Sequence, residues 1–168
     1  MMMQDDLSSL YAYSRWADDR VVAAARQLAA GQYVQEPAPG WSSVRATLVH
    51  VADATLIWAR RIAGEPVAGR AAESEVPTLD DAVRLFGQAH DAFDRLLPTL
   101  SSERLAAPWS YRNFEGKELR LPLWAVLRHV VNHATYHRGQ LASKLKRLGV
   151  DPPATDLVFW AASQTPRA

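Results

Sequence analysis

Two histidines one helical turn apart are the residues whose spacing most directly indicates chemistry. His133 and His137 lie in the run 129–140, and His129 precedes them by four residues. At about 100° per residue, His133 and His137 lie roughly 40° apart on one helix face, beside apolar Val130. Neutral imidazoles held one turn apart are suitable ligands for a metal ion. We therefore interpret His133 and His137 as candidate metal ligands.

A helical pair of ligands needs a third donor from another element, and His50 is the best-placed candidate. It lies at the margin of the apolar stripe in a second amphipathic segment, 44–63. Helix bundles hold metals between facing helices, and three imidazoles leave coordination positions open for water or substrate. Open positions are typical of a catalytic site. His90 is more consistent with the margin of the core, and His129 with either a hydrogen-bonding partner of the site or the surface.

Four segments with helical periodicity would position these histidines. Apolar residues at three- and four-residue steps predict helices over about 5–30, 44–63, 79–97 and 121–148. The proline-flanked residues 65–77 predict a long crossover between the second and third helices, and residues 109–121 are compatible with a short β-hairpin. The expected fold is an all-α four-helix bundle forming one domain over residues 1–168. The expected helix ends are marked by Ser42 or Ser43, Thr78 with Asp81, Gly31, Gly64, Pro98 and Gly149.

Composition narrows the function classes. The 168 residues include 19 basic and 18 acidic side chains, a formal charge of +1 that gives no electrostatic footprint for nucleic acid or a membrane surface. No apolar run approaches the roughly 20 residues of a membrane span, and no signal-peptide pattern is present. The chain contains no cysteine, which excludes disulfides, thiolate ligands and cysteine nucleophiles. We expect a cytoplasmic protein that binds neither nucleic acid nor membrane.

Segments 48–53 (LVHVAD) and 129–140 (HVVNHATYHRGQ) resemble the two signature regions of the DinB family, and the Leu-Trp pair at 123–124 fits as well. The resemblance covers essentially the whole chain. It implies a four-helix bundle, commonly homodimeric, with a divalent metal ion held by three histidines that correspond to His50, His133 and His137. Zinc or nickel is the favoured metal. Family members with assigned activities include transferases that use small thiols such as bacillithiol or mycothiol, and a mycothiol-dependent isomerase.

The residues between the paired histidines indicate which kind of metal-dependent reaction to expect. The motif reads His-Ala-Thr-Tyr-His and lacks the glutamate that zinc peptidases use as general base, so peptidase chemistry is disfavoured. We assign no protein general base and expect metal-bound water or thiolate to react. Any thiol must come from a low-molecular-weight cosubstrate, because the chain has none. The predicted function is a metal-dependent enzyme, a thiol-dependent S-transferase or a hydrolase, acting on a small molecule.

A second hypothesis is a non-catalytic, dimeric stress-response or binding protein with a structural or vestigial metal. The apolar tail at 157–161 favours it, because such a patch is expected to pack on the bundle as a short helix or against a second subunit. Loops 65–77 and 106–121 are expected to shape any pocket. The remaining candidates are Trp58 and Trp124 as pocket walls, and Asp53 and Tyr136 as partners of the site. Gln140 lies near the histidine face, where it could hydrogen-bond a ligand, but an exposed or packing role is favoured for both Gln140 and Arg138.

Overall fold

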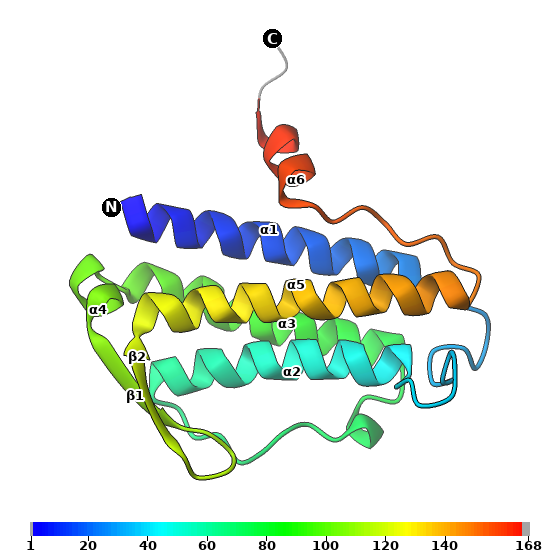
Figure 1. Cartoon of the computed structure of the whole chain (residues 1–168), viewed down its shortest axis with the longest axis horizontal. Helices are drawn as coiled ribbons and strands as arrows, with labels where there is room; N and C mark the ends of the chain where they lie inside the picture. The colour runs from blue at the N-terminus through cyan, green and yellow to red at the C-terminus, as the bar shows by residue number, and fades with distance from the viewer. Residues whose placement is uncertain (1, 166–168) are drawn as a thin grey trace.

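Four long helices lie side by side and form the body of the protein in this computed structural model, which describes residues 2–165 (Figure 1). They are α1 (Met2–Ala25), α2 (Val44–Ala63), α3 (Leu79–Leu96) and α5 (Leu123–Arg147). The structure confirms a mostly helical fold with a small antiparallel hairpin before the last long helix. None of the described helices is long and apolar enough to cross a membrane. The shorter elements are η1 (Glu73–Glu75), η2 (Leu97–Thr99), α4 (Ser102–Ala106), β1 (Pro108–Arg112), β2 (Glu118–Pro122) and α6 (Leu157–Gln164).

Short-range hydrogen bonds set the ends of α2 and the start of α3. The Ser43 hydroxyl accepts a hydrogen bond from the Ala46 amide at 3.0 Å, and Gly64, with a φ of 77°, ends α2. Thr78 and Asp81 form the reciprocal capping box that begins α3. Because these signals are local, both helices begin where the sequence predicts.

Helix α1 is shorter than the helix predicted over about 5–30. It ends at Ala25, and the Gln27 amide then bonds to the Ala24 carbonyl at 3.0 Å, a three-residue spacing instead of the four of an α-helix. Gly31 was the expected stop, but its φ of 85° belongs to a later turn in the connection to α2.

Packing of α2 against α5 brings the histidine-bearing faces together. Helix α2 packs on both α3 and α5, and α1 packs on α5. Leu48 and Val51 of α2 share one buried cluster with Ala134 and Leu141 of α5. Burial of these two apolar stripes sets the rotation of each helix about its axis, so the three candidate ligands face one another.

The hairpin is joined directly to α5. Its strands pair Trp109 with Leu121 and Tyr111 with Leu119. Within the turn, the Asn113 side-chain oxygen accepts a hydrogen bond from the Lys117 backbone amide. Strand β2 ends at the residue before α5 begins. The hairpin therefore has a defined position relative to the helix that carries two of the histidines.

Residues 64–78 connect the end of α2 to the start of α3 along the outside of the bundle (Figure 1). Two contacts anchor this connection. The side chain of Val76 is buried in the core, and Arg45 Nε lies 3.3 Å from Glu73 Oε2. The connection and the hairpin both lie beside α2, and together they enclose one flank of the histidine cluster.

The apolar tail forms α6, which projects from the bundle beside α1 (Figure 1). None of its residues is buried. Its main aromatic contact is between Trp160 and Tyr13, whose ring centroids lie 6.2 Å apart. Leu157, Val158 and Phe159 are 44%, 66% and 54% exposed. The tail is thus a short helix, as predicted, but it keeps most of its apolar surface exposed.

Candidate metal centre

The three candidate ligands meet at one point between two helices. His50 of α2 places its Nε2 atom 3.1 Å from the Nε2 atoms of both His133 and His137, and those two atoms lie 3.2 Å apart. Nitrogens bound to one zinc ion at 2.0–2.1 Å would lie about 3.3–3.4 Å apart in tetrahedral geometry and about 3.0 Å apart in octahedral geometry. The observed separations fall between these values, so the donor set fits a divalent metal ion held on one face by three imidazoles.

A side chain one turn further along α5 sets the tautomer of one ligand. His137 Nδ1 lies 2.8 Å from Gln140 Oε1. Because an amide oxygen can only accept, Nδ1 carries the proton and Nε2 presents its lone pair to the cluster. Gln140 therefore orients the ring of His137; the sequence placed Gln140 near the histidine face but did not identify this hydrogen bond.

The cluster favours neutral imidazoles. Burial lowers the pKa of His133 from 6.5 to about 4, with further lowering by His137 and His50. The pKa of His50 is also lowered, first by burial and then by His137 and Arg70. These rings are therefore uncharged near neutral pH, which is the protonation state that a metal ion requires of histidine.

A cavity of about 280 Å³ opens beside His50 and His133. Helices α2 and α5, the hairpin and the connection after α2 all contribute to its walls, as the sequence analysis expected of the two loops. Trp58 lines it as predicted, whereas Trp124 is not among its lining residues; both tryptophans also pack against the same core cluster. The remaining residues of interest on its walls are Asp53, Arg61, Arg70, Tyr111, Phe114 and His129.

Asp53 and His129, which the sequence suggested as hydrogen-bonding partners of the site, make other contacts in the structure. Asp53 accepts a hydrogen bond from the backbone of Ala71, and burial raises the pKa of its carboxyl. His129 packs edge-to-face on Trp58, with ring centroids 5.7 Å apart, and its ring lies 5.8 Å from that of His133. His129 thus belongs to the cavity wall, while Asp53 supports the connection after α2.

Tyr136 and Arg138 flank the cluster on α5 in opposite environments. The Tyr136 side chain is 65% exposed, and its ring centroid lies 5.1 Å from that of His137. Arg138 is only 2% exposed and donates from Nη1 to Asp18 Oδ1 at 2.8 Å. It also donates from Nη2 to the Thr135 hydroxyl at 2.7 Å. The sequence missed this buried ion pair, which ties α5 to α1 beneath the site.

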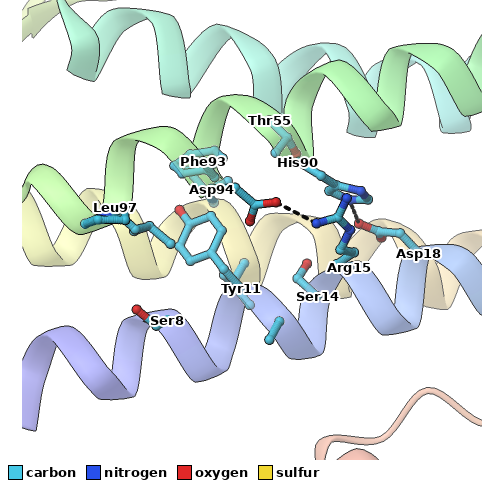
Figure 2. Close-up of a pocket in the computed structure, with 14 residues that line it drawn as sticks. Ser8, Tyr11, Ser14, Arg15, Asp18, Thr55, His90, Phe93, Asp94 and Leu97 are labelled. Carbon is cyan, nitrogen blue, oxygen red and sulfur yellow. Dashed lines mark hydrogen bonds and ion pairs between the residues drawn. The ribbon is translucent and has the colours of Figure 1, made fainter.

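His90 lies away from the cluster, at a separate cavity of about 290 Å³ between α1 and α3. Figure 2 shows its ring directed toward Asp18, with His90 Nε2 3.2 Å from Asp18 Oδ2. In the same view Arg15 pairs with Asp94 at 2.6 Å. His90 therefore completes the buried polar network around Asp18, which agrees with its interpretation as a residue at the margin of the core.

Comparison with known proteins places this geometry in a family. The DinB family profile matches residues 3–168. The chain is 28% identical over 159 residues to protein DinB of Bacillus subtilis (strain 168), covering 92% of each. YfiT of B. subtilis, described as a probable metal-dependent hydrolase with an unusual four-helix bundle topology, has a TM-score of 0.67 at 16% identity over 88% of this chain and 90% of YfiT. The DinB-like protein YjoA of B. subtilis has a TM-score of 0.63 at 14% identity, over 88% of this chain and 97% of YjoA. A family match over nearly the full length, on a fold shared with these proteins, shows that the chain belongs to the DinB family.

Proposed function

We propose that His50, His133 and His137 hold a divalent metal ion, and that the protein is a metal-dependent enzyme acting on a small molecule. The convergence of three Nε2 atoms beside an open cavity is the observation that carries this proposal. Three ligands from the protein leave coordination positions for water or substrate. When bound, the metal would act as a Lewis acid that lowers the pKa of a coordinated water or thiol.

The residues of this chain would supply binding and orientation. Burial keeps His50 and His133 neutral, and Gln140 holds the proton of His137 on the nitrogen that faces away from the cluster. The aromatic rings of the cavity wall, Trp58 among them, would bind the apolar part of a small molecule beside the cluster.

Two reaction classes are consistent with this site. Hydrolysis is supported by the fold likeness to YfiT, which is described as a probable metal-dependent hydrolase. Thiol-dependent S-transfer is supported by the family resemblance, and its thiol would come from a low-molecular-weight cosubstrate because the chain has no cysteine. Zinc or nickel is the proposed metal, since the donors are three imidazole nitrogens.

We also propose that the protein is a cytoplasmic homodimer of one domain per chain. The exposed apolar side chains of α6 support association with a second copy, because they have no cover within the described residues. In the single domain, the connection at 64–78 would be the bundle's crossover, since α2 and α3 run in the same direction in Figure 1.

Metal content and turnover test the proposal together. Protein prepared without a metal-affinity column should contain about one zinc or nickel ion per chain, and His137→Ala should lose it. His129→Ala, on the same helix but outside the cluster, should keep it. Wild type should then show metal-dependent turnover, in thiol conjugation of electrophiles or in hydrolysis of small esters and amides, that His137→Ala lacks. A stoichiometric metal without any turnover would favour the non-catalytic binding protein, and absence of metal would refute the metal-dependent enzyme.

A further inference from the structure

Two arginines lie on the wall of the metal-centre cavity, stacked on the same aromatic ring. The Cζ atom of Arg61, on α2, lies 4.6 Å from the ring centroid of Phe114 and 5.5 Å from that of Trp58. The Cζ atom of Arg70, from the connection after α2, lies 5.2 Å from the Phe114 centroid. Phe114 is in the turn of the hairpin, so three separate segments bring these two guanidinium groups together.

Neither arginine forms an ion pair with a carboxylate of the described chain. Two carboxylates lie on the same wall. Asp53 accepts a hydrogen bond from the Ala71 backbone, and the charge of Arg70 opposes the rise in its pKa without forming an ion pair. Glu115 Oε2 accepts a hydrogen bond from the Asn113 side-chain amide at 3.4 Å. Seven of the other described arginines have a carboxylate partner within 4 Å, as Arg45 does with Glu73, whereas others, Arg60 among them, have none. The cavity therefore holds two cationic groups whose hydrogen-bond donors have no anionic acceptor.

The surroundings of Arg61 disfavour the positive charge of its guanidinium group. Burial is the main cause that lowers the pKa of its guanidinium; Tyr111 opposes this shift, and Arg70 lowers the pKa further. Two like charges near one ring repel each other, and a bound anion would remove that repulsion. Guanidinium groups present planar pairs of N–H donors that match the two oxygens of a carboxylate.

From this arrangement we infer that the cavity binds a small organic anion, with its carboxylate at Arg61 and Arg70 and its apolar part against Trp58, Tyr111 and Phe114. The volume of about 280 Å³ is at the lower end for ligand pockets, which limits the occupant to a compact molecule. His50 and His133 line the same cavity, so the far end of that molecule would face the histidine cluster. As an assignment of substrate class, this inference rests on the proposed function. The carboxylate would belong either to the substrate or to the thiol cosubstrate.

A metal-independent measurement tests the anion site alone. Benzoate and benzamide have nearly the same shape and differ in charge, and their affinities for metal-free protein are measured by calorimetry at constant ionic strength. We expect benzoate to bind roughly 10- to 100-fold more tightly, the factor for one charge-assisted hydrogen bond. Arg61→Gln and Arg70→Gln should each remove most of that preference. Arg60→Gln, an exposed neighbour that lines a different cavity, is the matched control and should keep it.

A second experiment uses cobalt-loaded protein to determine whether the carboxylate belongs to the substrate or to the thiol cosubstrate. Thiolate binding is followed by the sulfur-to-cobalt absorption band, with 3-mercaptopropionate, 2-mercaptoethanol and cysteamine as anionic, neutral and cationic thiols. An arginine-dependent preference for 3-mercaptopropionate would support the inference and place the anion on the cosubstrate. A preference seen with benzoate alone would support it and place the anion on the substrate.

The two proposals fail in different ways. Equal binding of benzoate and benzamide, unchanged by either arginine substitution, would overturn the anion site even if the metal-loaded protein turned over neutral substrates. Arginine-dependent benzoate binding in a protein that takes up no metal would uphold the anion site while refuting the proposed function.

Discussion

Metal addition should raise the thermal stability of the protein through His50, His133 and His137 alone. A ligand that binds only the native state at 100 times its Kd stabilises it by about 2.7 kcal/mol. A domain of 150–250 residues gains about 2–4 °C in Tm per kcal/mol, so this 168-residue chain should gain roughly 5–10 °C. The assay is a thermal melt of chelator-treated protein with and without zinc or nickel, followed by circular dichroism.

Replacing one ligand should separate the metal effect from ordinary loss of packing. His133 is half-buried, and in the metal-free protein its ring faces two other imidazoles instead of a hydrogen-bonding carboxylate. His133→Ala should therefore change the metal-free stability by only about 1 kcal/mol while abolishing the rise in Tm on metal addition. His129→Ala should keep the rise. An unchanged rise in His133→Ala, or no rise in wild type with zinc, nickel, manganese or iron(II), would refute the reasoning.

Three further predictions follow from the buried and exposed groups. Asp18→Ala should lower the free energy of unfolding by about 3–5 kcal/mol in urea titration, because it leaves the Arg138 guanidinium, 2% exposed, without its carboxylate. A loss below 1 kcal/mol would show that this ion pair is not structural. In metal-free protein, His133 takes up a proton below about pH 6.5 in the unfolded state but only near pH 4 in the native state. As the pH falls from 7 to 4, the free energy of unfolding of wild type should therefore drop by roughly 1–2 kcal/mol more than that of His133→Ala, a value reduced for the partial exposure of His133. Urea titrations at pH 4 and pH 7 that give the same difference would contradict this pKa. Phe159→Glu should convert dimers to monomers in sedimentation while the far-UV circular dichroism spectrum stays that of wild type, because Phe159 is 54% exposed within one chain. Wild type that is monomeric at micromolar concentration would exclude the dimer.

Features that depend on near neighbours in sequence could be predicted. The bounds of α2 follow from Ser43 and Gly64, and the shared face of His133 and His137 follows from helical periodicity alone. The position of His50 opposite that pair was a stronger inference, since it depends on which helices pack together. Its place at the margin of an apolar stripe made His50 the best candidate, and the family resemblance then implied the same assignment.

Features that depend on distant partners could not be predicted. Arg138 reads as a surface residue because nothing near it in sequence is acidic, and its partner Asp18 is 120 positions away. Arg61 likewise meets Phe114 only after the hairpin folds back over α2. The end of α1 was predicted too late because the apolar pattern continues past Ala25, while the backbone hydrogen bonds already change there.

The candidate metal ligands lie on helices, whereas part of the proposed anion site lies on loops, so metal binding and substrate choice would depend on different residues. All three candidate ligands are on α2 and α5, where core packing sets their positions, whereas Arg70 and Phe114 are on loops. Arg61 lies on α2 three turns after His50, roughly 16 Å along the helix axis, and helical side chains point back toward the N-terminus. It therefore reaches toward the histidine cluster from the side that the hairpin covers. Substitution of Phe114, which is uncharged, should accordingly change which molecules bind and leave metal affinity unchanged, whereas substitution of a metal ligand should do the reverse. A Phe114→Ala protein that keeps its metal but loses the preference for benzoate over benzamide would show that the two properties are built separately.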